Sequence, residues 1–195
     1  MANDINLVLE SERLILRPLT LDDTELEVEL GTDPEVMRYA GGTEPAQQTR
    51  QDMHKYVRRC AGGCIGVWCV ADRVTGEKLG SAILLPMPID EDDTNWDLIV
   101  GDDIPPGEIE VGYLFKRSAW GNGFATETTK RLLKFAFEET PLEEVVATID
   151  FDNKASGRVL EKAGLTGEGV RRSYGGDSLG FRITRQQWLK ARGKV

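Results

Sequence analysis

Apolar and polar positions follow two periods in turn between Glu108 and Glu139, the most regular stretch of the chain. Apolar side chains alternate with other residues from 109 to 115, and this period of two predicts a strand. From Thr126 the apolar positions recur at helical spacing, and Pro141 ends the helix. The apolar face of this helix comprises Ala125, Thr129, Leu132, Leu133, Ala136 and Phe137. The stretch therefore predicts a strand, a short loop and a helix.

The rest of the chain divides into similar short elements, and 195 residues suit a single domain. Alternation predicts further strands over residues 13–19, 65–71, 78–85, 144–151, 165–171 and 179–183. Helical spacing and end signals predict helices from Thr20 or Asp22, over about 34–39, over about 45–60 and over about 153–162. A short terminal turn is expected over 186–191.

The loop before the long helix contains glycine and asparagine, which accept positive φ and let a ligand approach the backbone. The first N–H groups of the helix point into this loop without intrahelical partners, and such a helix N-terminus suits a phosphate or pyrophosphate. The amides expected to bind it are those of Gly121, Asn122, Gly123, Phe124, Ala125 and Thr126.

Two other glycine loops do not fit this sequence. A P-loop requires Lys directly after its last glycine, where Phe124 stands here. The dinucleotide-binding fingerprint requires a third glycine, where Thr126 stands. That fingerprint also belongs to the first strand of a parallel sheet, whereas this loop lies past the middle of the chain.

The run WGNGFATE, from Trp120 to Glu127, resembles the coenzyme A loop of the GNAT superfamily of N-acetyltransferases, in particular its RimJ/RimL-type branch. Gly123 and Ala125 take the fourth and sixth positions of the family's [QR]xxGx[GA] pattern, while Trp120 replaces Gln or Arg. The segments SERLILRPLT (11–20) and NKASGRVLEKAGL (153–165) resemble two further segments of the branch, with Leu165 in place of Phe. Together they extend the resemblance over nearly the whole chain.

This resemblance implies an α/β (α+β) fold, the GNAT fold, with a central mixed, mostly antiparallel, twisted sheet of about six or seven strands and helices on both faces. It implies one domain over residues 1–195 and an enzyme that transfers an acetyl group from acetyl-CoA directly to a primary amine. The acceptor is expected to be a protein N-terminus or a small cationic amine. No metal is expected to take part, and both a monomer and a homodimer are compatible with the resemblance.

The resemblance also indicates which residues bind acetyl-CoA. Besides the loop amides, the backbone of Leu114 and Lys116 is expected to pair with the pantetheine arm, with the Leu114 N–H facing the thioester oxygen. Asn153 is expected to bind the pantetheine amide region. Lys116 or Arg117 either meets a phosphate or forms a solvated basic pair.

Glu110 is the first candidate for a general base acting through water, because its strand would lie beside the thioester. A structural carboxylate is the alternative interpretation. Many family members protonate the leaving thiolate with a Tyr, but Leu160 stands at that position here. Ser156 is therefore the candidate hydrogen-bond donor to the sulfur, unless it only starts a helix. The runners-up are Glu108 and Asp177 for the base and Tyr174 for the acid.

Charge limits the partners of this chain. The net charge of −9 and the pI near 4.8 give no basic face for nucleic acid. Nine carboxylates and no Lys or Arg lie between Asp90 and Glu110, which favours cationic partners. They fall mostly in residues 87–107, called the acidic segment below, an insertion relative to the resembled branch. Its apolar residues are expected to fold over the acceptor site, to contact a partner or to anchor a solvated loop: Trp96, Leu98, Ile99 and Val100.

The acceptor site in this family lies against two N-terminal helices. Met37, Tyr39 and Tyr56 are therefore expected either to contact the acceptor or to pack in the core. A different class of function also fits the sequence: a non-catalytic acyl-CoA-binding regulatory module on the same fold. A purely structural protein conflicts with the glycine loop.

The location of the protein is expected to be cytoplasmic. No apolar run approaches the roughly 20 residues of a membrane span, and the N-terminus has no signal-peptide pattern. The three cysteines lack zinc-site spacing and are expected to be buried or reduced thiols: Cys60, Cys64 and Cys69.

Overall fold

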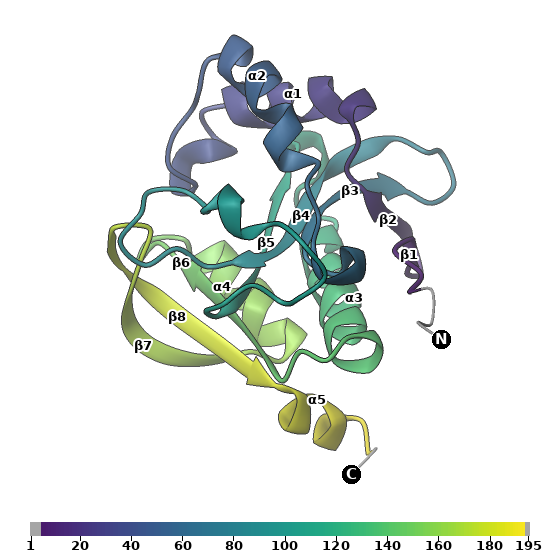
Figure 1. The fold of residues 1–195 in the computed structure, drawn as a ribbon, viewed down its shortest axis with the longest axis vertical. Helices are drawn as coiled ribbons and strands as arrows, with labels where there is room; N and C mark the ends of the chain where they lie inside the picture. The colour runs from purple at the N-terminus through teal and green to yellow at the C-terminus, as the bar shows by residue number, and fades with distance from the viewer. Residues whose placement is uncertain (1–4, 194–195) are drawn as a thin grey trace.

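The structure, a computed structural model, describes residues 5–193 and has a mixed sheet of eight strands at its centre (Figure 1). The strand order is β1-β2-β3-β4-β5-β6-β8-β7. All seven strands that alternation predicts are present. The eighth is β1, which has only two residues and adds an edge to the expected sheet. The strands are Leu9–Glu10 (β1), Leu14–Pro18 (β2), Gly66–Asp72 (β3), Lys78–Pro86 (β4), Ile109–Phe115 (β5), Glu144–Ile149 (β6), Thr166–Ser173 (β7) and Gly176–Thr184 (β8).

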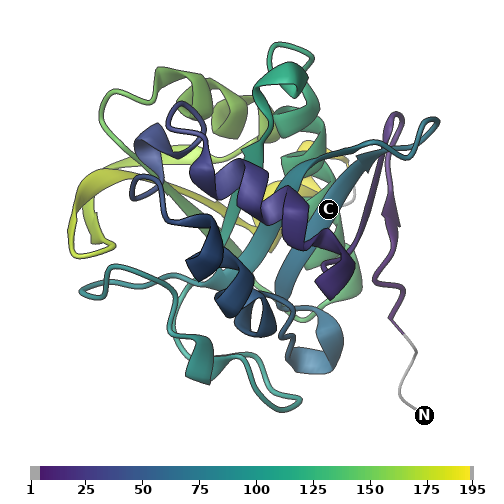
Figure 2. The ribbon, with the colours of Figure 1, turned by 90° about the horizontal axis from the view of Figure 1, so that it is seen from above.

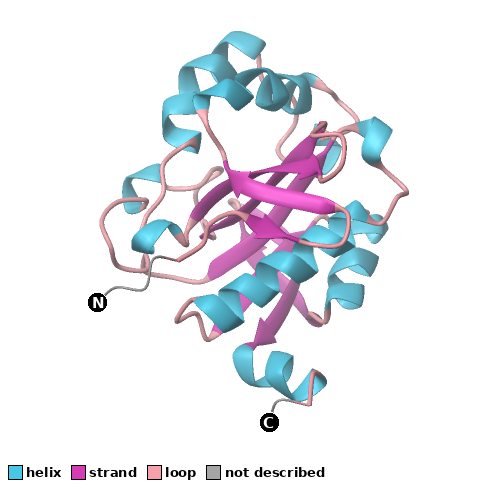
Figure 3. Cartoon of the chain, turned by 90° about the vertical axis from the view of Figure 1, so that its right-hand side faces the viewer, coloured by secondary structure: helices cyan, strands magenta, loops and turns pink. Residues whose placement is uncertain are grey.

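The helices cover both faces of this sheet (Figures 2 and 3). Helices α1 and α2 pack on each other, and α1 contacts β4. On the opposite face, α3 contacts β1, β2, β5 and β6 and packs on α4. None of the described helices is long and apolar enough to cross a membrane. The helices are Thr24–Thr32 (α1), Ala46–Tyr56 (α2), Phe124–Glu139 (α3), Lys154–Ala163 (α4) and Arg185–Ala191 (α5).

Helix α3 is the central packing element, as its sequence period predicts. The predicted apolar face is buried from Thr129 to Phe137. Thr128 and Phe135 are buried as well, because α3 contacts both the sheet and α4, which packs beside it on the same face. A contiguous cluster of apolar side chains joins this helix to the sheet.

Two predicted helices differ from the structure. Helix α2 ends at Tyr56 instead of Cys60. Cys60 lies outside the helix because it pairs with Ile65 across a turn in which Gly62 and Gly63 have positive φ. The helix expected over 34–39 is a single 3-10 turn, Met37–Tyr39. Cys60, Cys64 and Cys69 are buried free thiols, and burial raises the pKa of each.

Strands β5 and β6 form the only parallel pair among the described strands, and they pair only at Glu110 and Val146. Beyond this position the two strands separate toward their carboxyl ends. Helix α3 begins just after β5, and α4 begins just after β6. Two helix N-termini therefore lie at the open end of the gap.

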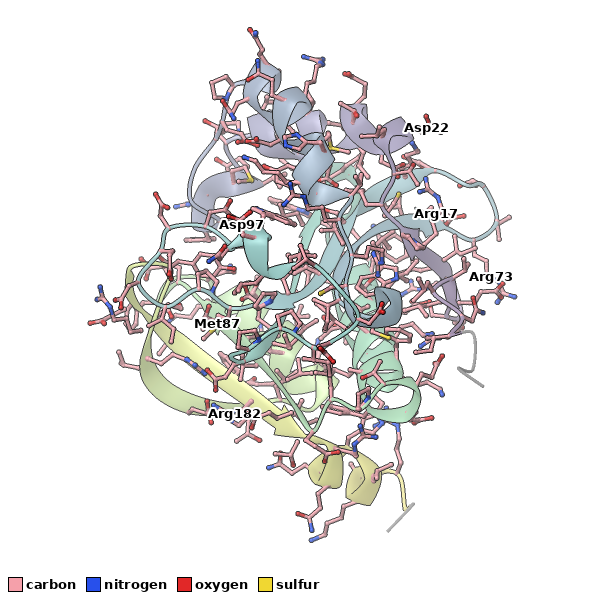
Figure 4. All side chains as sticks on the ribbon, viewed as in Figure 1. Arg17, Asp22, Arg73, Met87, Asp97 and Arg182 are labelled. Carbon is pink, nitrogen blue, oxygen red and sulfur yellow. The ribbon has the colours of Figure 1, made fainter. Side chains whose placement is uncertain are left out.

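The acidic segment passes across the face of the sheet opposite α3 (Figure 1). It is irregular apart from one 3-10 turn, Trp96–Leu98. Figure 4 shows Met87 and Asp97 of this segment on the side of the molecule that faces the viewer, with Arg182 of β8 below them. The segment connects β4 to β5 and also meets the turn between β7 and β8, through a hydrogen bond from Tyr174 N–H to Pro88 C=O.

Candidate active site

The glycine loop has the backbone that its sequence predicts. Gly121 and Gly123 have φ of 76° and 78°, and no atom lies within 4 Å of where a Cβ on Gly121 would stand. Glu127 N–H donates to Gly123 C=O, the first bond of α3. The N–H groups of Phe124, Ala125 and Thr126 have no partner among the described residues. The loop is therefore an open cradle of unpaired donors.

Three side chains fix the shape of this cradle. The Trp120 indole N–H donates to Phe115 C=O at 2.8 Å and ties the loop back to the end of β5. The Asn122 amide donates to Ala119 C=O and Trp120 C=O, and Asn122 C=O accepts from Arg13. Arg13 also pairs with Glu127 at 2.7 Å, so the residue just before β2 holds the loop against α3.

Cationic side chains that sequence reasoning missed lie beside the cradle. Lys130 and Lys162 line a shallow depression of about 380 Å³ together with Gly123 and Thr126. Both lysine side chains are exposed and form no ion pair among the described residues. Their spacing in the sequence gives no signal, because α3 and α4 bring them together only in the fold.

The β4–β5 ladder determines which backbone groups of β5 face the gap beside β6. Lys116 N–H donates to Leu79 C=O at 2.9 Å, and Glu108 C=O accepts from Met87 N–H at 2.9 Å. The strands pair between these bonds without a register shift. Because hydrogen-bonded positions alternate in an antiparallel pair, the even-numbered residues of β5 turn their backbone groups toward β4.

Leu114 and Lys116 therefore do not offer free backbone groups to the gap, contrary to expectation. Leu114 pairs with Ser81, and its C=O lies against Gly80. The Lys116 side chain is also committed, since its ammonium group pairs with Glu29 of α1 at 2.7 Å. The backbone groups that face the gap belong to Tyr113 and Phe115. Arg117 pairs with Asp33 at 3.0 Å, so this basic pair binds α1.

Ser156 and Tyr113 form a pair of hydroxyl groups on the α3 and α4 side of the gap. Asn153 caps α4 by accepting from Ser156 N–H at 3.1 Å, which fixes Ser156 in the first turn. The Tyr113 hydroxyl group lies beside Ser156, but it makes no hydrogen bond of good geometry to a described residue. Burial raises the pKa of Tyr113 to about 12, and Ser156 acts in the opposite direction. Sequence reasoning placed Tyr113 only on a strand face.

Glu110 lies on the opposite face of β5, where β5 and β6 separate, and is 4% exposed. Burial raises its pKa to about 7, although Tyr174 and the charge of Arg171 lower it. The Tyr174 hydroxyl group donates a hydrogen bond to Glu110 Oε1. Tyr174 was expected at most as a substitute acid for the thiolate, but the structure places it on Glu110.

The two runners-up for the base do not share these properties. Glu108 is paired with Arg171 and Arg182, and these arginines hold its pKa below the usual range despite partial burial. Asp177 is exposed at the end of the β7–β8 hairpin. Among the three candidates, only Glu110 is a buried carboxyl group without an ion pair.

A second carboxyl group with a buried oxygen, that of Glu27, lies on the same face of the sheet as Glu110 and was missed by sequence reasoning. Ser81 Oγ donates to Glu27 Oε2 at 3.5 Å, and Glu27 Oε1 is buried without a partner among the described residues. Burial, together with the charges of Asp23 and Glu44, raises the pKa of Glu27 to about 7, although the hydrogen bond from Ser81 lowers it. Ser81 pairs with Leu114 on β5, so the two carboxyl groups lie along one strand pair.

Aromatic side chains cover this face. The rings of Tyr56 and Trp96 lie 5.2 Å apart, which anchors the acidic segment to α2. Ile99 is buried, whereas Val100 is exposed, so part of the expected apolar cluster packs and part does not. Tyr39 is exposed, and it does not pack in the core.

The chain matches a known family over most of its length. Residues 13–166 match the family model described as an acetyltransferase (GNAT) domain. The Bacillus subtilis protein YkkB, described as uncharacterized, is 34% identical over 158 residues, which cover 80% of this chain and 84% of YkkB. The FsC-acetyl coenzyme A-N(2)-transacetylase of Aspergillus fumigatus is 28% identical over 191 residues, covering 93% and 78%.

Solved structures show the same fold at lower identity. A GNAT family acetyltransferase from Bacillus anthracis has a TM-score of 0.72 at 22% identity, covering 92% of this chain and 99% of that one. The spermidine N-acetyltransferase from Vibrio cholerae, solved with CoA and spermine, has a TM-score of 0.69 at 17% identity, with the same coverage.

Proposed function

The chain belongs to the GNAT family of acetyltransferases, and from that premise we propose that it transfers an acetyl group directly to the primary amine of a cationic acceptor. A protein N-terminus and a small cationic amine are the two candidate acceptors. The observation that carries this proposal is Glu110, a buried carboxyl group without an ion pair at the point where β5 and β6 separate.

The residues at the gap fit acetyl-CoA. When bound, acetyl-CoA supplies the acetyl group as a thioester. We assign its pyrophosphate to the unpaired amides of the glycine loop, with Lys130 and Lys162 close enough to the same depression to add positive charge. The backbone groups of Tyr113 and the N–H of Phe115, in place of Leu114 and Lys116, would pair with the pantetheine arm, since the Phe115 C=O already accepts from Trp120. The amide nitrogen of Asn153, not used in capping α4, would also face that arm.

Glu110 is the proposed general base, accepting a proton from the acceptor through water. With a pKa of about 7, its carboxylate is populated near neutral pH and is still basic enough to take a proton. An α-amine, with an ordinary pKa near 8, is easier to deprotonate than a lysine side chain near 10.4. This difference of about 2.4 units, or roughly 3 kcal/mol, favours acceptors with a low amine pKa.

Ser156 is the proposed hydrogen-bond donor to the leaving sulfur. The capping bond from its N–H to Asn153 fixes its place at the start of α4. Tyr113 lies beside it with a buried hydroxyl group that has no partner of good geometry among the described residues. A buried hydroxyl group without a partner is costly, so a ligand atom or water is expected to complete this pair.

The charge of the acceptor face supports a cationic acceptor. Glu27, Glu44 and Glu110 lie on this face, and the acidic segment adds exposed carboxylates around it. The fold is shared with a spermidine N-acetyltransferase, which supports the same class. The run from Trp120 to Glu127 supports the RimJ/RimL-type branch, and the three free cysteines fit the reducing cytoplasm.

The test begins with calorimetric titration of acetyl-CoA into the purified protein. Saturable binding is then followed by a thiol-release screen of N-terminal peptides, polyamines and aminoglycosides. Absence of binding at millimolar acetyl-CoA would overturn the proposal. If Glu110→Gln combined with Ser156→Ala lowers turnover by less than about threefold, the proposed proton transfers are wrong and catalysis rests on positioning of the two substrates. Saturable acetyl-CoA binding without turnover of any acceptor would favour a non-catalytic binding module.

A further inference from the structure

The turn between β7 and β8 has an unusual residue in a left-handed conformation. Ser173 pairs with Gly176, which leaves Tyr174 and Gly175 as the two loop residues, with φ of 50° and 70°. Two-residue hairpins of this kind favour Asn-Gly or Gly-Gly, because a large side chain is strained at positive φ. Strain of this kind persists only where the surroundings hold it, and it gathers at functional sites.

The acidic segment supplies the contacts that hold this turn. Tyr174 N–H donates to Pro88 C=O at 3.2 Å, and Gly175 N–H donates to Ile89 C=O at 3.0 Å. The Asp90 carboxylate pairs with Arg172 at 2.5 Å, just before the turn. In a free hairpin the central amides of such a turn face water, so these bonds are specific to the contact between segment and turn.

The β7–β8 turn, held in this way, brings the Tyr174 side chain into contact with the candidate base, Glu110. The Tyr174 hydroxyl group reaches Glu110 on β5 and donates a hydrogen bond to its carboxylate, although the tyrosine residue is itself 39% exposed. Among the described residues, the Glu110 side chain has no second hydrogen-bond partner and no ion pair. Its orientation on the acceptor face therefore depends on a residue 64 positions away in sequence.

We propose that the acidic segment is a structural clamp: it holds the β7–β8 turn against β5 so that the Tyr174 hydroxyl group positions Glu110 for proton transfer. The proposal rests on the proposed function and deepens it, because it gives Tyr174 a positioning role and gives the inserted segment a reason to be there. Tyr174 acts through Glu110 and is not itself the proton acceptor.

The groups around Glu110 determine how its pKa changes when the hydrogen bond from Tyr174 is removed. Tyr174 and Arg171 both favour the carboxylate, whereas burial disfavours it. From β4 and β6 the paired neighbours are Leu85 and Val146, which carry no charge. The charge of Asp93, in the acidic segment, reaches Tyr174. Tyr174→Phe therefore raises the pKa of Glu110 above its value of about 7.

The direct test measures this pKa without any substrate. The carboxyl carbon of Glu110, assigned with Glu110→Gln, is titrated by NMR in the ligand-free protein and in Tyr174→Phe, which keeps the ring. An upward shift of about one pH unit is expected. A shift below about 0.3 unit overturns the role of Tyr174. Because no acetyl-CoA is present, this outcome is independent of whether the proposed function holds.

The clamp is tested by amide hydrogen exchange of Tyr174 and Gly175. Both amides are expected to be protected, and Asp90→Ala is expected to speed their exchange about two- to fivefold, the range for an exposed ion pair. Asp103→Ala is the matched control, since Asp103 is an exposed carboxylate of the same segment that lies away from this turn in sequence. Unprotected amides, or equal effects of the two variants, overturn the clamp.

Activity gives a separate readout. The ratio of kcat/KM for Tyr174→Phe to that of the wild type is expected to be low near pH 7 and to recover toward 1 at pH 9, because the acceptor's own titration cancels in the ratio. A ratio lowered equally at every pH would contradict the effect of Tyr174 on the pKa of Glu110, because only that effect changes with pH.

Discussion

Trp120 donates its indole N–H to the carbonyl oxygen of Phe115 at 2.8 Å, which closes the loop between β5 and α3 on itself. This bond explains how Trp serves at a position where the resembled family has Gln or Arg. The indole occupies the last backbone acceptor of β5, and the neighbouring amides stay free for a ligand. Trp120 is half exposed, so its role is to shape the loop more than to fill the core.

Trp120→Phe is expected to lower the free energy of unfolding by about 0.5–1.5 kcal/mol, the net value of one hydrogen bond, and to weaken acetyl-CoA binding several-fold. Chemical denaturation and calorimetry measure the two effects. Trp96→Phe is the matched control, because its indole N–H is also hydrogen bonded, at 3.2 Å to Asp93, but on the opposite face. Equal losses of acetyl-CoA affinity in both variants would contradict the role of Trp120.

Gly123→Val is expected to weaken acetyl-CoA binding at least tenfold, because a branched side chain at the start of α3 both resists positive φ and covers the phosphate cradle. Gly76→Val in the β3–β4 turn is a closely matched control. Its φ of 75° is close to the 78° of Gly123, and no atom lies within 4 Å of where its Cβ would stand. The two variants therefore share the strain, and only Gly123→Val should lose affinity in calorimetry.

The sequence predicts the features that depend on neighbouring residues, and it misses those that depend on contacts between distant segments. The strand and helix between 109 and 139 are confirmed, because their periods depend on neighbouring residues alone. The assignment of Leu114 and Lys116 to the coenzyme fails because the alternation of free backbone groups on β5 is set by pairing with β4. Glu27, on α1, carries no sign in its own neighbourhood that its carboxyl group would be buried.

The family resemblance predicts Glu110 as the candidate base, but it does not predict which residues surround the Glu110 side chain. Glu110 and Tyr174 meet only because β7 and β8 fold back beside β6 and their turn reaches β5. The acidic segment is expected as an insertion of unknown use, and nothing in its composition predicts that two of its backbone carbonyl groups bind that turn. Such contacts depend on sheet topology, which single-sequence patterns do not contain.

Glu110→Gln is expected to lower kcat/KM by about 10²–10⁴, the usual range for loss of a general base, while leaving the Kd for acetyl-CoA within about twofold. In the wild type, kcat/KM should rise with pH through about 7 as Glu110 loses its proton, and this limb should vanish in Glu110→Gln. Steady-state rates between about pH 5.5 and 9 test both statements. Glu77→Gln, an exposed change in the β3–β4 turn, should retain the wild-type profile.

Ser156→Ala and Tyr113→Phe are each expected to lower kcat by about 10–100-fold with little change in acetyl-CoA affinity, because both hydroxyl groups lie on the coenzyme side of β5. If they act as one hydrogen-bonded unit, the double variant should lose less than the product of the single effects. Rates at saturating acetyl-CoA give kcat, and calorimetry gives the affinity. Additive losses would show that the two hydroxyl groups act separately.

Glu27→Gln is expected to stabilise the protein at high pH. The pKa of Glu27 is raised from 4.5 to about 7 by burial, so the folded state binds this proton more tightly than the unfolded state. The protonated Glu27 side chain therefore contributes its full stabilisation below pH 4.5, and this stabilisation is lost as the pH rises from 4.5 to about 7. The shift corresponds to an upper value of about 3 kcal/mol, and the neutral amide avoids that loss.

The pKa of Glu110 is raised as well, so Glu110 also makes stability depend on pH. That contribution is present in both proteins and cancels when the unfolding free energy of the wild type is subtracted from that of Glu27→Gln. The difference therefore reports Glu27 alone. Urea denaturation at about pH 4.5 and pH 8 should give nearly equal stabilities at the lower pH and a variant more stable by about 1–3 kcal/mol at the higher pH. A variant that is less stable than the wild type at high pH would mean that the buried carboxylate has a partner that neutralises it. In that case the acceptor face carries less uncompensated negative charge than the structure indicates.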